Sequence, residues 1–352
     1  MAHVAIIDED QATGQVAEDY AFISGSYTHG FGAHMPTPRV YRPSSLVPAY
    51  FHFGAVQNRV LTNDGAHDIP EMHKAMFSMA ERFVKHSWTS TADDIQHLRD
   101  LGVSDLDISE WLQIASIQTW FTNSADAGGI PMEGNAITGP VMRHERAFYH
   151  ESRPANDAQI SSSGADTATS ACATGWLSAP CEGDAFASCA AWSNERYGFV
   201  PNLMQGLSAC ADFYSRHQLA LELLERPQSD SLSDSLHALV RARVIAMNNS
   251  HYFMPTAQAM LDRSSPGVMM SDLASDSFAV EDSSNQMVLD FVAKMVRNPY
   301  KIVADDAQRF RDAGFDDESY IDVFNTVAIQ TSLDRLANSI GVSADDRPLL
   351  ST

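Results

Sequence analysis

The residues with the greatest potential for chemistry lie between positions 237 and 256. Arg241 could serve as the counter-ion of a small organic anion, and Tyr252 could donate a hydrogen bond to it. Ser250 carries a hydroxyl group but is a weak nucleophile unless a base lies beside it. These side chains define a candidate pocket, formed by His237, Arg241, Ser250, His251, Tyr252, Phe253 and Thr256. The alternative interpretation is that Phe253 fills this pocket and that the region contributes only packing. In that case Arg241 should meet an internal acid, whereas in a binding site it should face a cavity that holds an anion or ordered water.

The segment Asn248–Ala257 resembles the active-site segment of the alkylhydroperoxidase D-like proteins, in the carboxymuconolactone decarboxylase superfamily. In that family the pattern is C-x-x-C-x-x-x-H, with a glutamate twelve residues before the first cysteine. Here the four positions are occupied by Ser250, Phe253, Ala257 and Ala238. The residues around them fit the family pattern: Leu236, Leu239, Val240, Arg243, Asn248, Asn249, Tyr252 and Pro255. The resemblance therefore implies an all-α fold and argues against the best-known activity of the family.

The missing groups are those that the redox chemistry of the family requires. Positions i, i+3 and i+7 share one face of a helix, so two thiols and an imidazole there can exchange a proton and form a disulfide. Pro255 suits the first turn of a helix, which would place residues 250–253 at the positive helix end, where a thiolate is stabilised. Phe253 can neither resolve a sulfenic acid nor form a disulfide.

Three functions are compatible with the altered motif. The first is a divergent protein without thiol peroxidase chemistry that binds a small metabolite or acts as a scaffold. The second is cofactor-free acid/base catalysis on a carbonyl or lactone, although the decarboxylase branch usually keeps a histidine where Ala257 stands. The third is a peroxidase with relocated cysteines, at Cys172, Cys181 and Cys189. We expect no cofactor and no metal, because neither a phosphate loop nor a metal-ligand spacing is present.

The amino-acid composition and the net charge indicate which binding partners and which cellular compartment to expect. The chain has 352 residues and a formal net charge of −22, and only four of its residues are lysines. Such an acidic protein is poorly suited to bind nucleic acid or an anionic membrane surface. The N-terminus lacks the pattern of a signal peptide, and no segment reaches the roughly 20 apolar residues of a membrane span. We therefore expect a cytoplasmic protein whose four cysteines are free thiols.

An internal repeat is the second strong signal in the sequence. Residues 92–102 and 304–314 agree at seven of eleven positions, and the offset of 212 continues to residues 117–119 and 329–331. Asp93 and Asp305 suit helix starts, and Gly102 and Gly314 suit helix ends. Apolar residues at steps of three and four predict the next helices over 107–125 and 319–337.

The repeat divides the chain into two helical units of the alkylhydroperoxidase D-like type. We expect a truncated unit over residues 1–135, a small and polar linker over 136–190, and a second unit over 191–345 that contains the degenerate motif. The segment Tyr197–Asn202 resembles the G-F-V-P-N segment of the peroxidase-related branch of the superfamily. The halves should pack about a pseudo-two-fold axis, as two copies would in a dimer, and a homo-oligomer of the whole chain is also compatible with this organisation.

The altered motif leads to a first testable prediction. The purified protein should show no dithiol-dependent reduction of hydroperoxides, because positions 250 and 253 hold Ser and Phe. The measurement is hydroperoxide consumption with a dithiol reductant, for the wild type and for single Cys→Ser variants at positions 172, 181 and 189. Turnover abolished by one of these variants would support relocated cysteines. Turnover that survives replacement of all four cysteines would show that another group does the chemistry.

Overall fold

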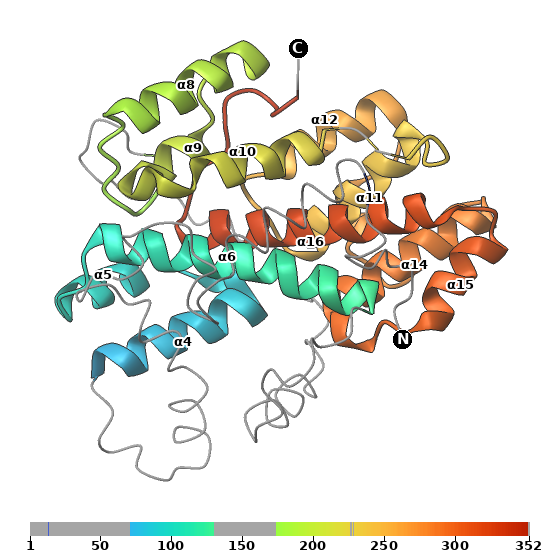
Figure 1. Ribbon diagram of the computed structural model, residues 1–352, viewed down its shortest axis with the longest axis horizontal. Coiled ribbons are helices and arrows are strands. Elements are labelled where there is room, and N and C mark those ends of the chain that lie inside the picture. Colours follow the sequence, from blue (N-terminus) through green and yellow to red (C-terminus); the bar gives the residue numbers. More distant parts are fainter. Residues whose placement is uncertain (1–12, 14–70, 130–173, 226, 228, 351–352) are drawn as a thin grey trace, which may run out of the picture.

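The computed structural model describes residues 13, 71–129, 174–225, 227 and 229–350. These residues form helices and connecting turns, with no strand among them, so the expected all-α class is confirmed (Figure 1). We call the described residues up to 129 the first half and those from 174 the second half. The described helices of the first half are α4 (Glu71–His86), α5 (Ala92–Asp100) and α6 (Asp105–Gly128). Those of the second half are α8 (Asp184–Tyr197), α9 (Asn202–Gly206), α10 (Tyr214–Leu223), α11 (Asp234–Met247), α12 (Met254–Ser264), α13 (Met270–Leu273), α14 (Ser283–Arg297), α15 (Ala304–Asp312) and α16 (Asp317–Ser339).

Three helices recur at the spacing of the sequence repeat. Helices α14, α15 and α16 begin 212 residues after α4, α5 and α6, respectively. A short 3-10 helix at Ser87–Thr89 recurs at Pro299–Lys301. Gly102 and Gly314 follow α5 and α15 with φ angles of 89° and 93°, a conformation that glycine adopts without strain. The predicted helices 107–125 and 319–337 lie within α6 and α16, so this part of the repeat is also structural.

Helices α6 and α16 lie side by side through the middle of the molecule (Figure 1). The hydroxyl of Tyr320, near the start of α16, donates to the carbonyl of Ala127 at the end of α6 (2.7 Å), so the pair is antiparallel. Each helix also contacts the short 3-10 helix of the opposite half: α16 contacts residues 87–89 and α6 contacts residues 299–301. Such reciprocal contacts are those of a pseudo-two-fold arrangement.

Helix α11 lies at the centre of the core of the second half. It contacts α12, α13, α14 and α16, and every residue from Leu236 to Met247 is buried. Its apolar side chains belong to one continuous cluster that also includes Met76, Phe83 and Leu112 of the first half. The two halves therefore share a core. Helix α11 has neighbours on several sides, so its polar residues are buried together with its apolar ones.

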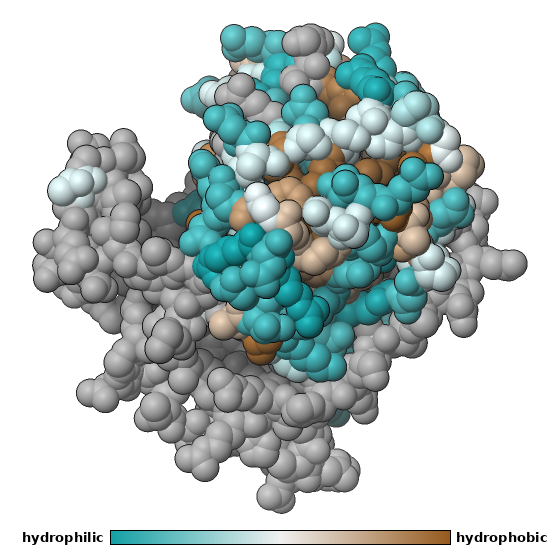
Figure 2. Space-filling view, turned by 90° about the vertical axis from the view of Figure 1, so that its right-hand side faces the viewer, coloured by the Kyte–Doolittle hydropathy of each residue, from teal (hydrophilic) through white to brown (hydrophobic). Residues whose placement is uncertain are grey.

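The surface of the described residues is mostly polar. The face shown in Figure 2 has hydrophilic residues with apolar ones scattered between them. Phe121, Met269 and Val303 are each more than half exposed, and single exposed apolar side chains of this kind are common on globular proteins. No helix of the described part is both long and apolar enough to cross a membrane.

The predicted linker differs from the structure at its C-terminal end. Residues 136–173 lie outside the described residues, as does nearly all of the first 70. Helix α8 begins at Asp184, so the predicted boundary at residue 190 falls inside a helix. This helix is anchored because Cys189, Ser193 and Tyr197 are buried against the rest of the second half. Residues 174–178 are also fixed, since Trp176 N donates to the carbonyl of Ile340 at 2.8 Å.

An ion pair joins the first of the three recurring helices to the start of the next, α4 to α5 and α14 to α15. In the first half Arg82 pairs with Asp94, and in the second half Lys294 pairs with Asp306 at 2.6 Å. Both aspartates also accept a backbone hydrogen bond of 2.8 Å from the residue before the helix, Thr91 or Val303. One carboxylate therefore caps the helix and binds the cation of its neighbour.

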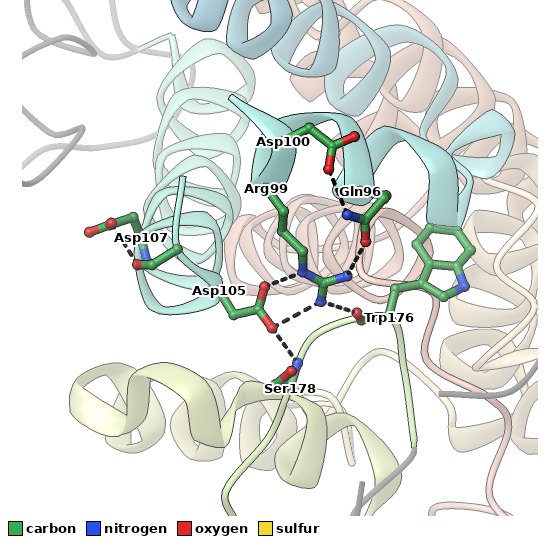
Figure 3. Close-up of polar contacts among 8 residues, drawn as sticks. Gln96, Arg99, Asp100, Asp105, Asp107, Trp176 and Ser178 are labelled. Atoms are coloured by element: carbon green, nitrogen blue, oxygen red, sulfur yellow. Dashed lines mark hydrogen bonds and ion pairs between the residues drawn. The ribbon is translucent and has the colours of Figure 1, made fainter. Parts of the chain in front are cut away.

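A second ion pair joins α5 to α6 in the first half and α15 to α16 in the second half. Arg99 Nε donates to Asp105 Oδ1 at 2.6 Å, and Arg311 Nε donates to Asp317 Oδ1 at 2.8 Å. The first of these pairs has additional partners, shown in Figure 3: Arg99 donates to the carbonyl of Trp176 and Asp105 accepts from Ser178 N, both at 2.7 Å. Partial burial raises the pKa of Asp105, but the hydrogen bonds from Arg99 and Ser178 outweigh this and hold the pKa below its usual value.

The repeated ion pairs allow a matched comparison of stability. Asp105→Ala should lower the free energy of unfolding by about 2–3 kcal/mol, because Arg99 and the Ser178 amide lose their acceptor. Asp317→Ala should cost less than about 1 kcal/mol, because an exposed pair is screened by solvent. Urea unfolding of both variants measures the difference. Equal losses would show that residues 174–178 do not depend on the Arg99–Asp105 pair.

Candidate functional site

Helices α11 and α12 and the turn between them position all seven candidate residues. Helix α11 begins after Ser233, whose hydroxyl accepts from Leu236 N, and it carries His237 and Arg241 one turn apart. The motif turn follows, and α12 starts at Met254 with Pro255 in its first turn, as the sequence predicted. Pro255 suits this place because the first-turn N–H has no partner within the helix. The turn therefore lies at the N-terminal end of α12.

Arg241 is buried, with 3% of its surface exposed. Its Nε donates to Gln330 Oε1 at 2.8 Å and its Nη1 donates to the carbonyl of Leu224 at 3.0 Å. We expected either a direct contact with an internal acid or a cavity holding an anion, and the structure shows a third arrangement. Neutral oxygens accept the hydrogen bonds, while the carboxylates of Asp334 and Glu225 act from a greater distance. Burial lowers the pKa of Arg241, and these two acids partly oppose the effect.

Asp334, on α16, is the acid nearest to this group in the hydrogen-bond network, and it is fully buried. Its carboxylate accepts from Gln330 Nε2 at 2.8 Å and from Asn248 Nδ2 at 3.0 Å. Burial raises the pKa of Asp334 to about 6, although these hydrogen bonds and the charge of Arg241 lower it. The result is a polar chain through the core, from Arg241 through Gln330 and Asp334 to Asn248.

Sequence reasoning did not identify Asp334, Gln330 or Asn248 as parts of the site. One signal was available, because Gln330 and Asp334 are four residues apart and share a face of α16. Polar residues in this relation within a helix that is otherwise rich in buried apolar residues indicate a buried network. Their connection to α11 depends on helix packing, which a single sequence does not specify.

Three buried polar atoms of this network and its neighbours have no hydrogen-bond partner among the described residues: Asn248 Oδ1, Ser250 Oγ and Asn338 Oδ1. Ser250 lies beside the Asp334 carboxylate and lowers its pKa, without the geometry of a hydrogen bond. Asn338 Nδ2 donates to the carbonyl of Asn248 at 3.3 Å. Buried polar groups of this kind are typical hydration sites in protein interiors.

The aromatic residues of the motif are packed and not open to solvent. Phe253 has no exposed surface, and its ring lies against that of Tyr252 edge to face with a centroid distance of 4.6 Å. The hydroxyl of Tyr252 donates to Asp345 Oδ2 at 2.6 Å, and burial followed by the charge of Asp345 raises the pKa of this tyrosine well above 10. Thr256 Oγ1 accepts from Leu349 N at 2.9 Å. Residues 345–349 thus cover the start of α12.

The two histidines are in different environments. His251 is exposed, so it lies outside the buried network of Arg241, Gln330, Asp334 and Asn248. His237 is 3% exposed, and its Nε2 lies 3.3 Å from the hydroxyl of Thr326. Burial, and then the charge of Arg241, lower the pKa of His237 to about 3. A group with such a low pKa is a poor proton acceptor at neutral pH, so His237 is not suited to activate Ser250.

The cysteines do not form a second redox centre among the described residues. Cys189 is a free thiol with 1% exposure, and burial raises its pKa to about 11. A thiol of this kind has very little thiolate at neutral pH and reacts slowly. Cys181 is in a disulfide, so the expectation of four free thiols is wrong at this position. Cys172 lies outside the described residues.

Other features of the described part do not form an alternative centre. No group of three or more His, Cys, Asp or Glu residues there has the arrangement of a metal site. A cleft of about 370 Å³ lies between α14 and α15, and the Lys294–Asp306 ion pair forms part of its wall. Comparison with known proteins adds no assignment: no protein-family model, no curated protein and no solved structure matches the chain.

The burial of Asp334 leads to a prediction about pH. Its pKa of about 6 in the folded protein exceeds that of an unfolded aspartate, so the folded state binds the proton more tightly and its stability falls as pH rises towards 6. Asp334→Asn removes this dependence. From pH 4.5 to 7.5 the stability of the variant relative to the wild type should therefore rise by about 2 kcal/mol. Urea unfolding at the two pH values measures this change. A constant difference would show that Asp334 titrates like an exposed carboxylate.

Proposed function

We propose that the chain is a divergent relative of the alkylhydroperoxidase D-like proteins that lacks peroxidase activity and acts as a helical scaffold. The observation that carries this proposal is the position of Phe253. A phenylalanine occupies the place of the second cysteine, has no exposed surface and packs on Tyr252. A side chain that fills the site removes both the thiol and the space for a substrate, while it adds apolar contacts to the core.

The hydrogen bonds of the remaining motif residues support the same proposal. Arg241 is bound by Gln330 and by the carbonyl of Leu224, and Tyr252 is bound by Asp345. A residue that recognises a ligand must exchange its partners for those of the ligand, and inside a protein this exchange is costly. These contacts therefore favour a structural role over the binding of a small organic anion.

The two enzymatic alternatives have less support from the geometry. Acid/base catalysis on a carbonyl or lactone requires a group that accepts a proton near neutral pH, and the buried His237 has a pKa of about 3. A peroxidase with relocated cysteines requires a reactive thiolate, and burial raises the pKa of Cys189 to about 11. Small-anion binding is the stronger of the other candidates, because the candidate residues include the guanidinium group of Arg241.

The proposal is tested by opening the filled site. Phe253→Ala should lower the free energy of unfolding by about 3–5 kcal/mol, because it leaves a cavity in the core. A small aromatic compound such as benzene should raise the Tm of this variant and leave that of the wild type unchanged. Leu219→Ala is the matched control, since Leu219 is 48% exposed and its replacement leaves no cavity.

The same thermal-shift measurement distinguishes the anion-binding alternative. A panel of small carboxylates should leave the Tm of the wild type unchanged. A carboxylate that stabilises the wild type but not Arg241→Ala would contradict the scaffold proposal and assign an anion site to Arg241. Benzene that raises the Tm of the wild type as much as that of Phe253→Ala would show that the site is already open.

A further inference from the structure

The cleft between α14 and α15 is built from side chains outside the motif region. Its volume of about 370 Å³ is near the lower end of the roughly 300–1,000 Å³ that is usual for small-molecule sites, so only a small ligand fits. Charged and apolar side chains both line it, among them Met287, Asp290, Phe291, Lys294, Asp306 and Arg309. None of the seven candidate residues of the motif region belongs to its lining.

Two contacts fix how the walls of this cleft face each other. Helices α14 and α15 lie side by side (Figure 1), and Lys294 of α14 pairs with Asp306 of α15 at 2.6 Å. Near the other ends of the two helices, Ser284 Oγ donates to the carbonyl of Ala313 at 3.3 Å. The two helices are therefore antiparallel, and a step back along α14 corresponds to a step forward along α15.

Opposite charges lie on the two walls one turn away from the Lys294–Asp306 pair. Asp290 lies one turn before the lysine of this pair on α14, and Arg309 lies one turn after its aspartate on α15. Both side chains line the cleft, but they form no ion pair with each other. The acid of the described part that pairs with Arg309 is Asp305, at 3.2 Å. The cleft therefore separates a carboxylate from a guanidinium group.

Both charged groups have capacity for a ligand. Asp290 Oδ1 accepts from Gln286 Nε2 at 2.7 Å, and no described residue donates to Oδ2. The side chains of Arg309 and Asp305 are 65% and 70% exposed, so solvent screens their attraction and the pair is weak. The guanidinium group of Arg309 can therefore turn to a ligand carboxylate, which it would bind through two N–H groups.

The repeat separates these two charges from the contacts that join the helices. The ion pair between the two helices recurs in the first half, between α4 and α5. The facing charges do not recur, because Ser78 and His97 stand 212 residues before Asp290 and Arg309. Joining the two helices therefore does not require an acid and a cation at these positions.

The cleft also offers an apolar surface beside the charges. Phe291 is 4% exposed, and its ring packs edge to face against that of Phe310 with a centroid distance of 5.1 Å. Met287 is half-buried on the same helix. Because Phe291 and Met287 both line the cleft, a ligand that reaches the two charges also contacts apolar side chains.

We propose that the cleft binds a free α-amino acid with an apolar side chain. The ammonium group of the ligand donates to Asp290, its carboxylate accepts from Arg309, and its side chain lies against Met287 and Phe291. A zwitterion fits because it pairs both walls, whereas an ion of one sign leaves the other wall unpaired. This proposal goes beyond the scaffold role, and no motif residue takes part in it, so either proposal can fail without the other.

The test is isothermal titration of the full-length protein with L-methionine, which should show saturable binding. Two analogues remove one charge each: N-acetyl-L-methionine has no ammonium group and L-methioninamide has no carboxylate. Each should bind about tenfold more weakly or worse, as expected for the loss of a hydrogen bond between charged groups. These changes leave the protein intact. This is useful because burial lowers the pKa of Arg243 and the charge of Asp290 partly opposes that effect, so a variant at Asp290 also alters the surroundings of Arg243.

Variants of the protein locate the two contacts. Asp290→Asn and Arg309→Gln should each weaken L-methionine binding about tenfold or more. Asp290→Asn should change the affinity for N-acetyl-L-methionine less than about twofold, because that ligand has no ammonium group to lose. Arg309→Gln should have as little effect on L-methioninamide.

The matched controls are Asp262→Asn and Arg263→Gln on α12, where both residues are exposed. Asp262 accepts from Gln258 Nε2 at 2.8 Å, the same four-residue contact that Asp290 makes with Gln286. Both controls should bind L-methionine as the wild type does. Absence of saturable binding to the wild type would overturn the proposal, and so would binding that neither Asp290→Asn nor Arg309→Gln weakens. N-acetyl-L-methionine that binds as tightly as L-methionine would overturn it as well, because the site would then recognise only an anion.

Discussion

The burial of Arg241 between α11 and α16 is the constraint on which the motif region depends. Removing a guanidinium group from water costs several kcal/mol unless hydrogen bonds and an opposite charge compensate. Here an amide oxygen and a backbone carbonyl accept the hydrogen bonds, and Asp334 supplies a charge beyond Gln330. This arrangement fixes the end of α10, α11 and α16 relative to one another. It also directs the side chain of Arg241 into the core, where it has a structural role.

The repeat shows the same pair of ionic contacts in two different environments. Both halves have the same two ion pairs, and in each half the helices that the pairs connect begin at matching positions. The difference lies in what covers them. Residues 174–178 lie over the Arg99–Asp105 pair, and the partial burial strengthens its hydrogen bonds. The Arg311–Asp317 pair is more exposed, so it should contribute less to stability.

Local signals in the sequence predicted the local structure correctly. The helix starts near Asp93 and Asp305, the helix ends at Gly102 and Gly314 and the first-turn position of Pro255 follow from backbone chemistry, which acts over a few residues. The surroundings of Arg241 were not predictable in this way. Its partners Leu224 and Gln330 are 17 residues before it and 89 residues after it, so their contacts depend on helix packing.

The start of the second half shows that composition alone does not locate every helix. Small and polar residues before position 184 resemble a linker, and composition gives no sign that α8 begins there. The helix is stabilised by contacts of its later residues, Cys189, Ser193 and Tyr197, with distant parts of the chain. Two aromatic residues in the predicted linker, Trp176 and Phe186, were the available signals, since both pack against the core.

In the proposed scaffold the motif turn is a sealed part of the core. Native-state hydrogen exchange of the backbone amides from Ser250 to Ala257 can test this, because exchange reports the free energy of the opening that exposes each amide. We expect the hydrogen-bonded amides of Met254 and Ala257 to exchange only through global unfolding, with the same free energy as the amides of α11. Exchange through a local opening that costs several kcal/mol less than global unfolding would contradict it and would indicate a site that opens to admit a ligand.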